Sequence, residues 1–150
     1  MRDTEKTVHA LTSQYGTSCP FTLCECMGIQ VLEQELPHDV NGFCVYLFQR
    51  YVIVLNDRLH GRIREAVCAH ELGHIILHGC VNSLVLKRDT HFYLPRYEHE
   101  ADFFCACLLL DSRLPEWAGE HDTLTIEQVS ALSGLPESLV KLRFNRDVCA

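Results

Sequence analysis

The sequence predicts an α+β fold in which a small sheet packs against two long helices. Two stretches, 59–78 and 97–110, repeat apolar residues at helical spacing. Three shorter stretches, 29–36, 43–48 and 51–55, are rich in the branched and aromatic residues that favour strands. With 150 residues, 47% of them hydrophobic and 22% charged, the chain is long enough to form one globular domain with a real core.

The first 28 residues are expected to be a helical lead-in. A weak helical pattern covers 5–15, and Gly16 follows it as a breaker. Pro20 suits the first turn of a short helix that continues through Met27 and ends at Gly28.

The three strand candidates follow the lead-in. Pro37 closes the first strand, and Asn41 with Gly42 is a turn signal. Gln49 and Arg50 separate the second and third strands and suggest a tight hairpin, although neither residue is a favoured turn former. We expect a small antiparallel sheet of about three strands.

Two long helices follow the sheet. The first is expected over 59–78, where Gly79 is a suitable stop. The connection 80–96 is long for a compact domain, and such loops often carry function. The second long helix opens after Pro95 and ends near Leu110.

The C-terminal region predicts a helical hairpin, with helices over 125–132 and 136–143. Pro115 and Gly119 mark the boundary before it. The stretch 126–135 also has the cadence of a DNA-binding helix-turn-helix. It carries few basic residues and the whole chain has a formal charge of −7, so a hairpin packed on the rest of the fold is favoured over direct nucleic-acid binding.

The motif His70-Glu71-x-x-His74 lies in the first long helix. Residues four apart lie on the same side of a helix, so both imidazoles can hold one zinc ion while Glu71 reaches a water on the metal. Helical spacing puts the two histidines on one stripe, which we expect to be the buried face; its other members are Ile63, Ala66, Val67 and Leu77. Two core histidines satisfied by hydrogen bonds are the less favoured alternative. Gly73 between them suggests a close backbone approach, or simply packing.

A third zinc ligand is expected from the second long helix, because catalytic zinc usually takes three protein ligands. Glu98 and Asp102 share one face of that helix, whereas Glu100 lies about 200° from Glu98. We therefore expect Glu98 on the metal, with Asp102 accepting a hydrogen bond from a ligand histidine. Glu100 fits an exposed acidic helix start.

Composition limits the location and the partners. The charged N-terminus is not followed by an apolar segment, and the longest apolar run, 103–110, is too short to span a bilayer, so we expect a cytoplasmic protein without membrane contact. The nine cysteines are then expected to be reduced. The C-x-C pairs at 24–26 and 105–107 are interpreted as small buried apolar residues, with a second metal or redox site as the alternative.

Two motifs together resemble the ImmA/IrrE metallopeptidases. They are Ala69-His70-Glu71-Leu72-Gly73-His74-Ile75-Ile76-Leu77-His78 and Glu98-x-Glu100-Ala101-Asp102-x-Phe104-x-Ala106-x-Leu108-Leu109. The stretch 53–56 and the regions 15–20 and 124–139 are similar too, so the resemblance covers most of the chain. It implies a compact zincin-like fold and site-specific cleavage of a helix-turn-helix repressor, often of a phage or an integrated element.

These observations predict a zinc-dependent endopeptidase. One domain would span 1–150, with a lead-in at 1–28, a catalytic core at 29–115 and C-terminal helices at 116–150. It would act as a monomer on a partner protein, which an edge strand of the sheet, expected to be the 51–55 run, could hold by strand addition. Candidate donors for the oxyanion are His78, His91, Tyr93 and Tyr97.

Two other functions remain open from the sequence. The chain could be an anti-repressor that acts by binding alone, with a structural metal, although such a site does not need Glu71. Metal-assisted hydrolysis of a small molecule is a third class, and no pocket signal supports it.

Overall fold

A computed structural model describes residues 2–80, 94–119 and 123–144. Seven helices and three strands lie in these ranges: α1 Arg2–Tyr15, α2 Pro20–Cys26, β1 Gln30–Gln34, β2 Gly42–Leu47, β3 Arg50–Asn56, α3 Gly61–His78, α5 Leu94–Leu110, α6 Leu114–Ala118, α7 Ile126–Ser133 and α8 Glu137–Phe144. The α+β class and the C-terminal helical hairpin agree with the prediction. Within the described ranges, no helix is long and apolar enough to cross a membrane.

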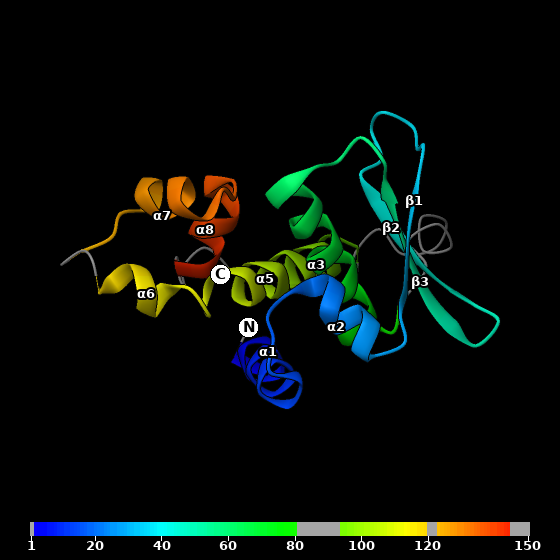
Figure 1. The fold of residues 1–150 in the computed structure, drawn as a ribbon, viewed down its shortest axis with the longest axis horizontal. Helices are drawn as coiled ribbons and strands as arrows, with labels where there is room; N and C mark the ends of the chain where they lie inside the picture. Colours follow the sequence, from blue (N-terminus) through cyan, green and yellow to red (C-terminus); the bar gives the residue numbers. More distant parts are fainter. Residues whose placement is uncertain (1, 81–93, 120–122, 145–150) are drawn as a thin grey trace.

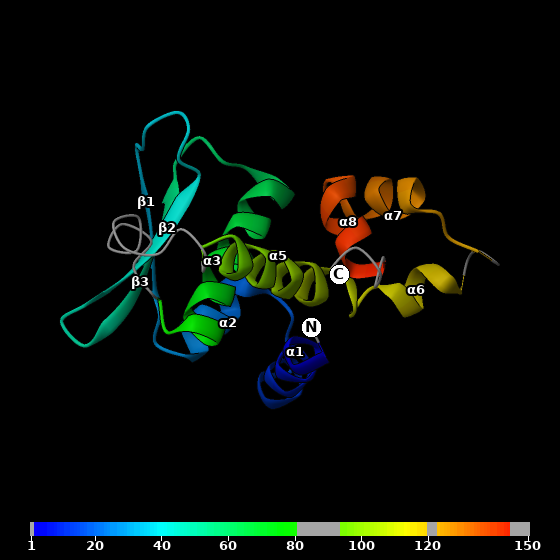
Figure 2. The same ribbon diagram turned by 180° about the vertical axis from the view of Figure 1, so that it is seen from behind.

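The elements are arranged around α3. The sheet and α2 pack on α3, and α5 packs on another of its sides (Figure 1). Helices α1 and α8 both pack against α5 (Figure 2). One hydrophobic core runs through these contacts, and it includes Val8 of α1, Leu72 of α3, Phe104 of α5 and Val140 of α8.

The sheet has the three strands that were expected, but it is mixed rather than antiparallel. Its order is β1-β3-β2; β2 pairs antiparallel with β3, while β1 pairs parallel with β3. The link from β1 to β2 crosses the end of β3, where the Asn56 side-chain amide donates to the carbonyls of Leu36, Pro37 and Val40. Strand composition does not encode which strands become neighbours, so the prediction missed this crossing.

The β2–β3 hairpin turns one residue earlier than predicted. Leu47 pairs with Arg50, so Phe48 and Gln49 form the turn. Their φ angles are 49° and 63°. Tight hairpins favour this left-handed backbone because it matches strand twist, but residues other than glycine and asparagine rarely adopt it. The identities of Phe48 and Gln49 therefore did not indicate a turn at these two positions.

Close packing of α3 and α5 brings the two motif helices together. A Cβ atom at Gly73 would lie 3.1 Å from Cδ1 of Phe104, tighter than most real contacts. The neighbouring atoms belong to the Phe104 side chain, so of the two interpretations of Gly73 the structure supports packing. Gly79 then ends α3 in the left-handed conformation, with φ 62°, as expected for a helix stop.

The histidine stripe of α3 is only partly in the core, which corrects the prediction. Ala66 is buried in the core, and Val67 and Leu77 pack against it. Ile63 is 42% exposed, and Val67, His70 and His74 are only half-buried, whereas Leu72 on another face is fully buried. The first part of the stripe, from Ile63 to His70, lines an open cleft. A helix stripe that lines a binding cleft can be as apolar as one that faces the core. Composition alone therefore does not distinguish the two positions.

The C-terminal helices are fixed by capping and burial. Thr125 and Gln128 form a reciprocal capping box at the start of α7. Val129, Leu135 and Val140 are buried in the common core, so the pair packs on α5 as favoured above. Sequence reasoning missed α6, because Pro115 was taken as a boundary although proline also suits the first turn of a helix.

Candidate metal centre

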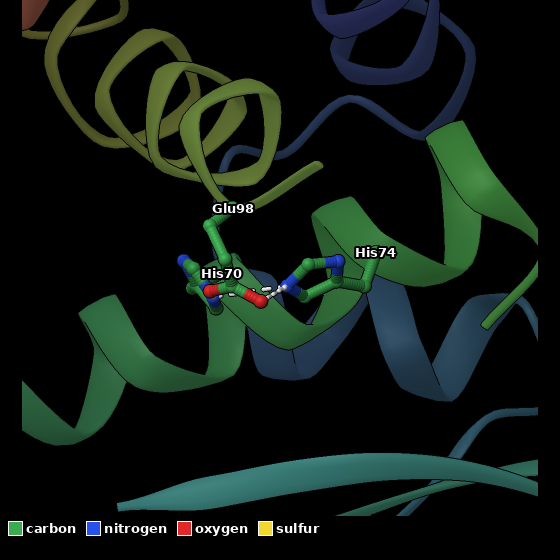
Figure 3. Close-up of side chains that lie close together, drawn as sticks. All are labelled: His70, His74 and Glu98. Atoms are coloured by element: carbon green, nitrogen blue, oxygen red, sulfur yellow. Dashed lines mark hydrogen bonds and ion pairs between the residues drawn. The ribbon is translucent and has the colours of Figure 1, made fainter. Parts of the chain in front are cut away.

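Three side chains from two helices converge beside the cleft. The Nε2 atoms of His70 and His74 on α3 lie 3.1 Å apart. The Glu98 carboxylate, from the first turns of α5, lies 3.2 Å from Nε2 of His70 and 3.3 Å from Nε2 of His74 (Figure 3). Among the described residues this is the one group of three or more potential ligands whose atoms lie within 4.8 Å of one another.

Asp102 fixes the orientation of His70. Its Oδ1 atom lies 2.8 Å from Nδ1 of His70. An ionised carboxylate can only accept, so Nδ1 carries the hydrogen and donates it. The Nε2 atom of a neutral His70 then presents its lone pair to Glu98 and His74, which is the arrangement that a metal-binding histidine needs.

The donor set fits a divalent metal such as zinc. Two imidazole nitrogens and a carboxylate are all acceptors, so their convergence needs a cation or a proton between them. Burial would lower the pKa of His70, but the hydrogen bonds to Asp102 and Glu98 and the nearby negative charges outweigh it and raise the pKa to about 10. The same hydrogen bonds to His70 and His74 lower the pKa of Glu98. The side chains of Glu98 and Asp102 remain 45% and 47% exposed, so they face the cleft and are not core groups.

Glu71 follows His70 on α3 and lines the same cleft as His70, Glu98 and Asp102. It is buried, with 8% exposure. Burial raises its pKa, and the electrostatic effect of the neighbouring His70 and His74 opposes that shift. The Cys44 thiol on β2 is hydrogen-bonded to the Glu71 carboxylate. The sulfur atoms of Cys44 and Cys80 lie 2.9 Å apart. A buried carboxylate with a raised pKa is a stronger base than an exposed one.

Glu100 points away from the ligand group. The Arg96 guanidinium donates to Oε1 of Glu100 at 2.9 Å. The other carboxylate oxygen of Glu100, Oε2, lies 3.5 Å from Nε2 of His78. The His78 ring stacks 4.2 Å from the Tyr97 ring, and burial lowers the pKa of His78. The structure thus separates Glu98 from Glu100 as the helical spacing predicted.

His78 and Tyr97 are two of the four candidate oxyanion donors. His78 lies one helical turn beyond His74 on α3, with the two rings 5.8 Å apart. Tyr97 of α5 packs its ring against the ring of His78. The other two candidates, His91 and Tyr93, lie outside the described residues, as does most of the long connection 80–96.

A cleft of about 760 Å³ opens from the ligand group, with His70, Glu71, Glu98 and Asp102 in its lining. Its other walls include Phe43 of β2 and Leu139 of α8. The strand that borders it is therefore β2, which is an edge strand among those described. The expected edge, the 51–55 run, is β3 and lies at the centre of the sheet, so that expectation is wrong.

Sequence reasoning missed two sets of residues at this site. Cys44 contacts Glu71, yet a single cysteine in a strand carries no signal for that contact. Ile63 and Leu139 line the cleft from positions 76 residues apart, and their apolar spacing indicated helix packing only.

The cysteines are mostly small buried residues, as interpreted. The eight described cysteines are free thiols. Cys24, Cys105 and Cys107 of the C-x-C pairs are buried, but Cys26 is exposed, so the interpretation is wrong for that residue. Within the described ranges these pairs do not belong to a second group of potential metal ligands.

The chain matches a known family over most of its length. Residues 24–145 match the family described as peptidase M78, IrrE N-terminal-like domain. The "Uncharacterized immunity region protein 2" of Bacillus phage phi105 is 34% identical over 139 residues, which cover 91% of this chain and 85% of the phage protein. "Metallopeptidase ImmA" of Bacillus subtilis is 25% identical over 142 residues, covering 93% of this chain and 82% of that protein.

A solved structure shares the fold. It is titled "Mycobacterium tuberculosis transcriptional regulator", and it superposes with a TM-score of 0.66 at 20% sequence identity. The match covers 95% of this chain but 46% of the mycobacterial chain, so this chain spans less than half of that protein.

Proposed function

Because this chain belongs to the ImmA/IrrE family of metallopeptidases, we propose that it is a zinc-dependent endopeptidase that cleaves a partner protein, namely a helix-turn-helix repressor of a phage or mobile element. The proposal extends to the site residues: His70, His74 and Glu98 hold the zinc ion, Glu71 is the general base, and Asp102 orients His70. One observation carries it, the convergence of three ligand atoms beside a buried glutamate at the mouth of a cleft.

Zinc bound by these three residues would polarise the scissile carbonyl and lower the pKa of a bound water towards about 7. Glu71 takes the proton of the attacking water and then delivers it to the leaving amine. Burial suits Glu71 to this task, because a raised pKa brings a carboxylate closer to neutral pH. Asp102 holds the His70 ring so that its Nε2 lone pair stays directed at the ligand group.

The edge strand β2 is proposed to hold the substrate in an extended form. It pairs with β3 on one side, and Gly42 and Phe43 line the cleft at its start. Backbone groups on an edge strand can pair with an added strand, which presents the substrate backbone alongside Glu71.

The proposed substrate class draws support from the names of relatives. The phage protein is named for an immunity region, and the Bacillus subtilis protein is named a metallopeptidase. A peptidase that acts on a phage repressor reconciles both names. Stable binding without cleavage is the competing possibility, and the position of the buried Glu71 beside the ligands favours catalysis.

The test begins with the genes that flank this one, among which a helix-turn-helix repressor is the expected substrate. Purified zinc-loaded protein should convert that repressor into two fragments, which gel electrophoresis and mass spectrometry would detect. The Glu71→Gln variant, which keeps the ligands but loses the base, should bind the repressor and leave it intact. Undiminished cleavage by this variant would reject the assigned mechanism.

A further inference from the structure

The cleft has a second end that the metal centre does not use. Besides the ligand residues, its lining includes Ile63 and Val67 of α3, Val40 before β2, and Pro136 and Leu139 at the start of α8. Ile63 is 42% exposed, although a branched aliphatic side chain is usually covered in a folded protein. Apolar side chains from three separate segments therefore surround one space next to the metal centre.

One wall of this apolar end is held rigid by hydrogen bonds. The buried Asn56 side chain donates to the carbonyls of Leu36 and Val40 at 3.1 Å and 2.9 Å, which fixes the 36–40 link beside the cleft. Val40, which lines the cleft, therefore has a defined position relative to the end of β3.

Helix α8, whose first turn forms another wall of the cleft, is anchored at both ends. The Arg62 guanidinium on α3 donates to the Ser133 carbonyl at 2.9 Å, just before the turn into α8. At the other end, Arg143 donates to Asp111 at 2.6 Å and to Glu5 at 3.1 Å. Leu139 therefore has a defined position relative to His70 and Glu71.

We propose that this apolar end is a subsite for a large aliphatic or aromatic side chain of the protein substrate, on a residue that flanks the scissile bond. Leu139 and Ile63 set the size of the side chain that it accepts. The inference rests on the proposed function. It gives the C-terminal helical hairpin a part in substrate recognition, through the first turn of α8.

The chemistry of the lining supports an apolar occupant. The acidic groups of the cleft, Glu71, Glu98 and Asp102, belong to the metal centre, while Asp39 lies on the exposed rim. Burying an apolar side chain against Ile63, Val67 and Leu139 removes apolar surface from water on both sides. Binding sites of this kind combine apolar walls with a few polar groups that fix orientation.

The test measures cleavage preference with a mixture of synthetic peptides that carries every residue at every position. Zinc-loaded wild-type protein should cut beside leucine, isoleucine, methionine or phenylalanine at least about tenfold better than beside alanine or glycine, as judged by mass spectrometry of the products. In Leu139→Trp, whose indole narrows the subsite, kcat/KM for the large residues should fall at least about tenfold relative to the small ones.

Leu132→Trp is the matched control. Leu132 lies on α7 of the same hairpin and is 42% exposed, but it is not part of the cleft lining. This variant should keep the wild-type preference. A purely structural role of Leu139 would lower cleavage of all peptides alike, so a changed ratio is the outcome that supports a subsite.

The outcomes separate this inference from the proposed function. Cleavage by the wild type with an unchanged preference in Leu139→Trp, or a preference for basic or small residues, would overturn the subsite and leave the peptidase assignment intact. Failure of the wild type to cut the repressor and every peptide would overturn the peptidase assignment, and the subsite with it.

Discussion

The two ends of the cleft are built in different ways. At the metal end, two proposed ligands come from one turn of α3, and the third comes from α5, which packs on α3 at Gly73. At the apolar end, the walls come from α3, the link before β2 and the start of α8. The first end depends on local helical spacing and one helix contact, whereas the second depends on the whole tertiary fold.

This difference predicts how substitutions act. Changes at the metal end should alter metal content and chemistry for every substrate. Changes at the apolar end should alter which substrates are cut and leave the metal in place. The predictions below test that division, beginning with the largest expected effect.

Removal of a proposed ligand should abolish zinc binding. His74→Ala and Glu98→Gln each leave two protein ligands of three, so neither purified variant should hold zinc or cleave the repressor. Elemental analysis after dialysis measures the metal. Glu100→Gln is the matched control two residues away, and Leu139→Ala is the control at the apolar end; both should keep about one zinc ion per chain, as expected for a single three-ligand site.

Glu71→Gln should separate metal binding from chemistry. The amide cannot accept a proton, so kcat for repressor cleavage should fall about 10²–10⁴-fold while zinc content stays normal. Single-turnover cleavage with excess enzyme measures the effect. Loss of zinc in this variant as well would show that Glu71 contributes to metal binding. Glu71 could then not be assigned to the chemistry alone.

Asp102→Ala should weaken the metal centre without destroying it. Loss of the hydrogen bond to Nδ1 frees the His70 ring, and the loss of such a partner typically costs about 10–100-fold in metal affinity or activity. Competition with a chelator of known affinity measures the change. If Asp102→Ala lost zinc completely, Asp102 would have to be reassigned as a ligand.

The metal end was predictable from the sequence because its information is local. His70 and His74 lie four residues apart on a helix, and Glu98 and Asp102 repeat the same spacing on another. The two helices were paired because catalytic zinc usually takes a third protein ligand, and the family resemblance agreed with that pairing. The prediction that this face of α3 is buried in the core was wrong for Ile63 and Val67, which line a cleft although both are apolar.

The apolar end could not be predicted, because its residues are distant in sequence and carry no motif. Leu139 meets the cleft only because α8 packs on α5 and Arg62 holds the turn before it. The strand order was missed for a related reason. Asn56 reaches over the link between β1 and β2, and nothing in the strand pattern indicates that contact.

Acidity should act on the metal-free protein through His70. Its pKa is raised from an ordinary 6.5 to about 10 in the folded state, so folding favours the protonated ring. The resulting stabilisation is present below pH 6.5 and is lost as the pH rises through about 10. Thermal unfolding of the metal-free protein should therefore show a falling midpoint over this range, and Asp102→Ala should flatten the fall.

The smallest predicted effect concerns Cys44, which contacts Glu71 from the edge strand. The hydrogen bond from the Cys44 thiol lowers the pKa of Glu71 and so opposes the effect of burial. A thiol is a weak donor, so its loss in Cys44→Ala should change kcat only about 2–5-fold, at the low end for a hydrogen bond. Cys44→Ser keeps a donor at the same place and should return kcat close to the wild-type value, whereas exposed Cys26→Ala is a control with no expected effect. Because Cys44 lies on β2 and Glu71 on α3, a change in kcat at unchanged KM would tie the strand that is proposed to hold the substrate to the chemistry at the metal end. A rise in KM alone would instead assign Cys44 to substrate binding.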